Sequence, residues 1–86
     1  MRLDKYLKLT RLIKRRGVAK VLINESQILV NDKPTKPAYD VKINDIIKLT
    51  LGRRSIVIKV KDLKEVVNKE NADTLYTIIK DSLTTK

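Results

Sequence analysis

The sequence has 86 residues and a net charge of +10, with twenty Lys and Arg side chains against ten acidic ones. It contains no Cys, which excludes disulfides and thiolate metal sites, and no His, which removes the commonest general base and metal ligand. We therefore expect one small, soluble, cytoplasmic domain that is not an enzyme, holds no cofactor or metal, and has no membrane segment. A charge balance this basic indicates a nucleic-acid partner.

The first twenty residues hold eight basic residues and one acidic residue, so they carry most of the net charge. Between Leu3 and Thr10, residues that suit a protein core recur at the spacing of one helix face, and basic residues lie on the opposite side of the helix. Asp4 lies in the first turn of this helix, where a carboxylate suits the helix dipole. We expect it to pair with Lys8, four residues along.

A second helix is expected near residues 15–25, after a turn at Leu12-Ile13 that packs into the core. Its apolar stripe would be Val18, Ala19, Leu22 and Ile23. The helix opens with Lys14-Arg15-Arg16-Gly17, where a capping Ser, Thr, Asp or Asn and acidic residues would be favoured. Cations at a helix N-terminus are neutral or destabilising unless an anion binds, so a phosphate contact is expected there. A solvated charge cluster is the alternative.

Past Ser26 the pattern changes to short β-branched runs, which predict strands over 28–30, 46–51 and 55–61. Pro34 and Pro37 exclude a central strand between them, so residues 35–39 are expected along a sheet edge. Leu63, Val66 and Val67 could cover the sheet, whereas residues 72–79 fit a short helix or a strand, and the pattern leaves both open. The predicted class is α+β, with two N-terminal helices packed on a small antiparallel sheet.

Motifs for catalysis or base stacking are missing. The two glycines, Gly17 and Gly52, are too far apart for a glycine-rich phosphate loop, and the three tyrosines are isolated in a chain without Phe or Trp. Recognition is therefore expected to depend on phosphates, sugar hydroxyls and shape, as is usual for folded RNA.

Three runs of sequence carry a family resemblance. They are Arg2-Leu3-Asp4-Lys5-Tyr6-Leu7, the spacing from Arg16 through Ala19 and Leu22-Ile23 to Val30-Asn31, and Val41 through Asn44-Asp45-Ile46. Together they resemble the ribosomal-protein-S-four-type (αL) RNA-binding domain over residues 1–51. This implies an αL domain with an extended sheet over residues 1–61 and a C-terminal extension over 62–86, packing on or trailing from it.

The sequence departs from that domain at four positions. Arg15 stands where the domain usually has Ser, and Ser26, Asp32 and Asn44 stand where it has glycine. Asn and Asp tolerate the left-handed backbone conformation better than most residues, so both turns are expected to form. Ser26 is the weakest of the three substitutes.

The run Arg11–Arg16 and the segment Tyr76-Thr77-Ile78 are similar to free-standing members of the bacterial ribosome quality-control family RqcP, which is close to the Hsp-fifteen type of heat-shock protein. The resemblance implies binding to large-subunit rRNA and P-site peptidyl-tRNA on stalled large ribosomal subunits. It also implies cooperation with an RqcH-like factor that adds a C-terminal alanine tail. The alternatives are an Hsp-fifteen-like recycling factor, a general polyanion binder, or a fragment of an enzyme that carries this domain.

The candidate RNA contacts follow from charge and from this resemblance. Arg2, Arg11 and Arg16 rank first, and the second rank is Lys5, Lys8, Lys14, Arg15 and Lys20. Lys33 and Lys36 would extend the contact surface, although a solvated loop explains them equally well. The free protein is expected to be monomeric.

Overall fold

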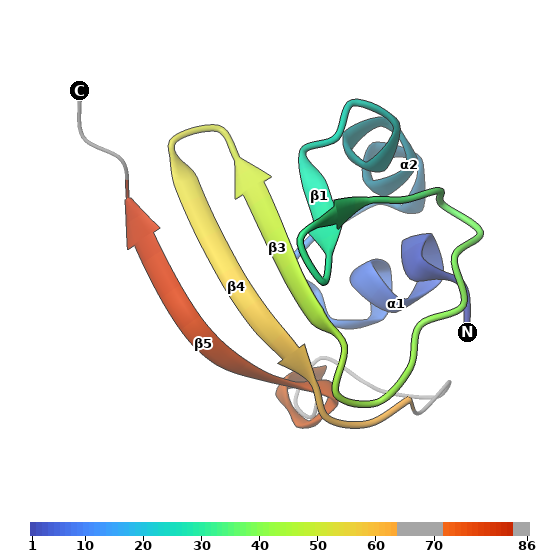
Figure 1. Ribbon diagram of the computed structural model, residues 1–86, viewed down its shortest axis with the longest axis vertical. Helices are drawn as coiled ribbons and strands as arrows, with labels where there is room; N and C mark the ends of the chain where they lie inside the picture. Colours follow the sequence, from blue (N-terminus) through green and yellow to red (C-terminus); the bar gives the residue numbers. More distant parts are fainter. Residues whose placement is uncertain (64–71, 84–86) are drawn as a thin grey trace.

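The computed structural model describes residues 1–63 and 72–83. Two helices, α1 (Leu3–Leu9) and α2 (Arg16–Asn24), precede a five-stranded antiparallel sheet of order β2-β1-β3-β4-β5 (Figure 1). The strands are β1 (Ile28–Val30), β2 (Lys33–Pro34), β3 (Ile46–Leu51), β4 (Arg54–Val60) and β5 (Tyr76–Leu83), and a 3₁₀ helix, η1 (Ala72–Leu75), leads into β5. The predicted α+β class is confirmed.

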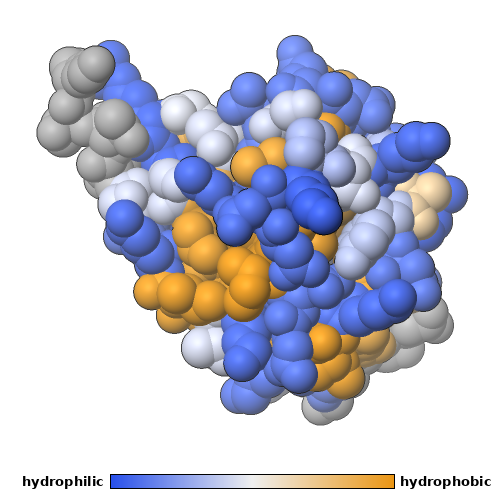
Figure 2. All heavy atoms as spheres, viewed as in Figure 1, coloured by the Kyte–Doolittle hydropathy of each residue, from blue (hydrophilic) through white to orange (hydrophobic). Residues whose placement is uncertain are grey.

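The core forms where α1, α2 and the loop between them meet one face of β1, β3 and β4. Alternate residues of β3 and β4 face it, since Ile47 and Leu49 are paired with Ile58 and Ile56 and all four are buried. The other face of the sheet carries Leu29, Lys48 and Val57 in one cross-strand row. Figure 2 shows an apolar area bordered by hydrophilic side chains over the middle of β4 and β5. The buried apolar residues are Leu3, Tyr6, Leu7, Ile13, Ala19, Ile23, Ile28, Val30, Val41, Ile47, Leu49, Ile56, Ile58, Val60 and Leu75.

The end of α2 has the geometry of a Schellman motif. The backbone N–H of Gln27 donates to the carbonyl of Leu22 (2.9 Å), and that of Ser26 donates to Ile23 (3.1 Å). This closure places Ser26 at a φ of 58°, in the left-handed region that favours glycine. Asp32 (φ 66°) and Asn44 (φ 77°) are left-handed as well, so all three positions predicted to replace glycines have that conformation.

The long connection from β2 to β3 is fixed by the buried carboxylate of Asp45. It accepts hydrogen bonds from Asn31 Nδ2 (3.1 Å), the Tyr39 hydroxyl (2.9 Å) and the Lys42 backbone N–H (2.9 Å). The amide oxygen of Asn31 in turn accepts the N–H of Ile46 (3.0 Å). These bonds replace the missing backbone ladder along a segment without regular structure.

The prediction that residues 35–39 run along the sheet edge is wrong. The edge strand is Lys33–Pro34, because the left-handed turn at Asn31 and Asp32 reverses the chain at once. The next residues instead serve α1, since the carbonyls of Tyr39 and Pro37 accept the backbone N–H groups of Leu3 (2.9 Å) and Asp4 (3.2 Å). Their backbone therefore caps the start of a helix.

Besides the pairing of β5 with β4, one carbonyl joins the described part of the C-terminal extension to α1 and to the residues after β4. The Leu75 oxygen accepts hydrogen bonds from the Tyr6 hydroxyl (2.7 Å) and from the backbone N–H groups of Lys61 (2.9 Å) and Asp62 (3.2 Å). Residues 72–79, which fitted a helix or a strand, contain both, a 3₁₀ turn and the start of β5. Leu63 packs against the core, while Val66 and Val67 lie outside the described residues.

The two helices are linked by a fully buried carboxylate, Asp4. Its oxygens accept hydrogen bonds from Arg2 Nε (3.2 Å) and Nη2 (3.3 Å) and from the backbone N–H of Lys5 (2.8 Å). Arg16 Nε, from the first turn of α2, lies 3.2 Å from Asp4 Oδ2. The predicted pairing of Asp4 with Lys8 is therefore wrong, because the side chain points inward between α1 and α2.

Burial raises the pKa of the Asp4 carboxyl, but the hydrogen bonds from Arg2, Arg16 and the Lys5 N–H outweigh it and leave the pKa below its usual value of 3.8. A carboxyl whose pKa is lower in the folded state than in the unfolded state stabilises the fold above the unfolded value. That stability is lost as the pH falls through the folded value.

The left-handed Ser26 predicts that Ser26→Gly stabilises the protein. Relief of the strained backbone should contribute about 1 kcal/mol, less the extra entropy of glycine in the unfolded chain. A full 1 kcal/mol raises the melting temperature of a domain of this size by about 4–8 °C, so the net gain should raise it by a few degrees. Ser55→Gly, in the extended backbone of β4, is the control and should lower the melting temperature. An equal fall for both variants would contradict the assignment.

The Asp4 ion pairs predict a pH-dependent stability that Asp4→Asn removes. At neutral pH the substitution should cost about 1.5–3 kcal/mol, the usual contribution of hydrogen bonds to a charged group. Melting temperatures measured from pH 7 to pH 2 should fall more steeply for the wild type than for Asp4→Asn below pH 4, where the carboxylate protonates. Asp81→Asn breaks the exposed pair with Arg54 and should have a smaller effect. Parallel pH profiles for wild type and Asp4→Asn would refute this role for Asp4.

Candidate nucleic-acid interface

The eight candidate contacts of the first twenty residues come from α1, α2 and the residues that flank them. Seven are exposed and Lys5 is half-buried. We call this set the helical cationic surface: Arg2, Lys5, Lys8, Arg11, Lys14, Arg15, Arg16 and Lys20. Asp4 is its single acidic residue, and its carboxylate is buried beneath Arg2 and Arg16.

Arg2 and Arg16, predicted separately from the sequence, are brought together by the structure on one carboxylate. Their side chains remain 48% and 45% exposed, so the guanidinium groups reach solvent while their Nε atoms are held. Two cations against one anion leave a net positive charge at this point. A guanidinium fixed in this way can present its remaining N–H groups to a phosphate with little further loss of side-chain freedom.

The pairing also corrects the expectation that Arg16 is neutral or destabilising in the free protein. Its unfavourable position at the start of α2 is compensated by Asp4, three residues from the N-terminus. The sequence pattern did not indicate that Asp4 positions the side chains of Arg2 and Arg16. The only local signal for Asp4 was its place in an otherwise basic helix, and the partner on α2 lies twelve residues away.

The start of α2 is open to an incoming anion. Arg15 is its N-cap residue, with extended backbone and without a side-chain hydrogen bond to the first turn. No acidic residue lies in that turn, and a Cβ atom built on Gly17 would meet nothing within 4 Å. The free N–H groups of the first turn and the Arg15 side chain therefore favour one phosphate group in common.

The remaining candidates lie at separate places. Lys8 on α1, Arg11 in the connecting loop and Lys20 on α2 are exposed, whereas Lys14 lies beside Arg15 at the rim of an apolar groove. Lys33 belongs to the edge strand β2, and Lys36 belongs to the segment that caps α1. These two lysines would extend the surface past the beginning of α1.

Other functional chemistry has little support in the part of the chain that is described. Within residues 1–63 and 72–83, no three acidic, His or Cys side chains gather as metal ligands. Among the same residues, neither helix combines the length and the apolar character needed to cross a membrane. The arrangement suits binding through charge and donor groups.

Comparison with known proteins agrees with this reading. The S4 domain family matches residues 1–47. The RQC P-site tRNA stabilizing factor of Listeria monocytogenes is 45% identical over 84 residues, covering 98% of this chain and 91% of its own. The factor of the same name from Streptococcus pneumoniae is 42% identical over 82 residues, covering 95% and 93%.

The fold has a solved counterpart in heat shock protein 15 of Vibrio cholerae, described as trimeric, at 26% identity and a TM-score of 0.86. The alignment covers 91% of this chain and 80% of that one. The S4 match, the paired arginines at the start of the two helices and the near-complete coverage of the relatives agree. The chain belongs to the S4-domain family and, within it, to the RQC P-site tRNA stabilizing factors.

Proposed function

We propose that the chain is an RNA-binding adaptor of ribosome quality control that binds the large ribosomal subunit and holds P-site tRNA there, with no catalytic activity of its own. The helical cationic surface carries this proposal, because it presents seven exposed cations, two of which are held by one buried carboxylate. The name of the relatives, RQC P-site tRNA stabilizing factor, supports the same role.

The chemistry of the surface fits the backbone of folded RNA. Arginine forks and lysine ammonium groups contact phosphates, which fix the position of a protein on RNA without reading its sequence. The exposed side chains of α1 and α2 include no aromatic residue, so stacking on aromatic rings contributes nothing here. Shape and charge are what such a surface recognises.

The finer partners follow from the family resemblance. We propose that the surface contacts large-subunit rRNA together with a stalled peptidyl-tRNA in the cytoplasm. An RqcH-like factor then extends the stalled chain with alanine while this protein keeps the tRNA in place. A role in recycling stalled subunits is the second candidate, favoured by the structural likeness to heat shock protein 15. Relatives at 41–45% identity support the role in holding P-site tRNA. They do so more strongly than one structure at 26% identity supports a recycling role.

Binding to large subunits that carry P-site tRNA should be strongly salt-dependent. If about six phosphates are neutralised, the logarithm of the association constant should fall with the logarithm of salt at a slope of about −4 to −5. Lys8→Ala should flatten that slope by about 0.7–0.9, which corresponds to one phosphate contact. Lys59→Ala, which removes an exposed lysine of β4, is the charge-matched control and should leave the slope unchanged. A flat salt dependence for the wild type would sink the proposal.

Substitution of the adjacent residues Arg15 and Arg16 distinguishes an effect on RNA binding from an effect on stability. The Arg15 side chain makes no hydrogen bond or ion pair with the described residues, so Arg15→Ala should lower affinity for these subunits about tenfold with an equal or slightly higher melting temperature. Arg16→Ala should lower both, because Asp4 then loses one of its two arginines. Co-sedimentation beside thermal melting measures the two effects. If Arg15→Ala sediments with subunits as well as the wild type does, Arg15 is no contact and the start of α2 is not the binding site.

A further inference from the structure

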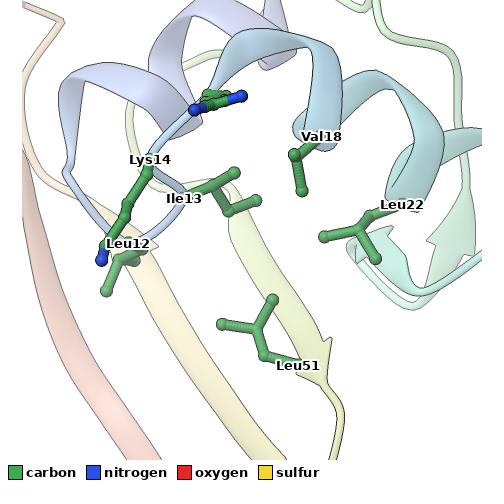
Figure 3. Close-up of a pocket in the computed structure, with 7 residues that line it drawn as sticks. Leu12, Ile13, Lys14, Val18, Leu22 and Leu51 are labelled. Carbon is green, nitrogen blue, oxygen red and sulfur yellow. The ribbon is translucent and has the colours of Figure 1, made fainter.

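An apolar groove opens between α2, the loop that precedes it and the end of β3. Its volume is about 430 Å³, within the range of sites that hold small organic groups. Figure 3 shows Val18 and Leu22 projecting from α2 toward Leu51 on β3, with Ile13 beside Val18 and Lys14 extending beside Leu12 at one edge.

The groove exposes apolar surface where sequence analysis predicted core. Val18 is 47% exposed, and Leu12, Leu22 and Leu51 are half-buried. Exposed aliphatic side chains that gather around a hollow are typical of a binding site rather than of a solvated helix face. The occupant therefore has an apolar part that fits between the helix and the sheet.

The rim of the groove sets the charge of the occupant. Lys14 and Arg15 both line it, and neither forms an ion pair with any residue of the described ranges. The uncapped first turn of α2 begins at the same place, and Arg11 precedes the rim in the loop. An occupant that enters here meets several cations and free N–H donors, so it carries at least one negative group next to its apolar part.

We propose that this groove receives one unpaired nucleotide of the bound RNA, with its base between the aliphatic walls and its phosphate at Lys14 and Arg15. The inference rests on the proposed function, because the same RNA would lie along the helical cationic surface, which continues directly into the rim. A nucleotide joins a flat apolar face to an anion at short range, and splayed-out bases are what proteins commonly bind in folded RNA. A peptide would need acidic residues on both sides of its apolar anchor to suit the same rim.

The lining also determines how selective the groove is. Its side chains are aliphatic or cationic, and with Lys14 and Arg15 on the phosphate no lining side chain is left to read the hydrogen-bonding edge of a base. The groove should accept all four bases within a few-fold of one another. What it distinguishes is an unpaired base from a paired or missing one.

Three hairpin RNAs of equal length provide the test: one fully paired, one with a single unpaired adenosine, and one with an abasic nucleotide at that position. The wild type should bind the adenosine hairpin about fivefold to tenfold more tightly than the other two, as expected for partial burial of one base against aliphatic side chains. Val18→Ser should reduce that preference to less than about twofold, since the groove then loses an apolar wall. Val21→Ser is the matched control, because Val21 lies three residues along α2 with 55% exposure but does not line the groove.

The outcomes separate this inference from the proposed function. Equal binding of the three RNAs, or tight binding of the abasic one, would overturn the nucleotide site while the helical cationic surface still binds RNA. Loss of large-subunit association in Val18→Ser with an unchanged hairpin preference would assign the groove to a protein segment and also overturn it. Weak, salt-insensitive binding of all three RNAs would contradict the proposed function itself. Melting temperatures of both valine variants show that each remains folded.

Discussion

The buried carboxylate of Asp4 is the interaction on which the surface of this protein depends. A chain with a net charge of +10 places many cations close together, and their mutual repulsion opposes folding. Asp4 receives Arg2 from the beginning of α1 and Arg16 from the beginning of α2, so it neutralises part of that charge where the helices meet. The same contacts hold both guanidinium groups in fixed positions. One ion-pair network therefore contributes to packing of the helices and to orientation of the binding groups.

A second constraint comes from the small size of the domain. A chain of 86 residues buries a limited core, and here the sheet recruits the described part of the C-terminal extension to complete it. The Leu75 carbonyl accepts donors from Tyr6 on α1 and from the segment after β4, while β5 pairs along β4. Burial raises the pKa of the Tyr6 hydroxyl, so Tyr6 stays neutral and remains a donor at physiological pH. The hydrogen bond from Tyr6 thus joins α1 to the C-terminal part of the chain.

Local features of this fold could be predicted from the sequence because their causes lie within a few residues. The two helices follow from apolar spacing, and the left-handed turns at Asp32 and Asn44 follow from residues that tolerate that conformation. Features that depend on distant partners could not be predicted. The Asp4–Arg16 pair joins two helices. The edge strand Lys33–Pro34 is short, and backbone carbonyls of the segment that follows it accept hydrogen bonds from the first turn of α1.

The run of cations at the start of α2 has two different explanations, and the difference lies in their partners. Arg16 is compensated within the protein by Asp4, so its position stabilises the fold. Arg15 and Lys14, one and two residues earlier, lack such a side-chain partner in the described structure and border an apolar groove. Uncompensated charge next to exposed apolar surface costs stability in the free protein. That cost is recovered when a partner supplies both an anion and an apolar group, which makes the start of α2 the point where charge and shape recognition of RNA coincide.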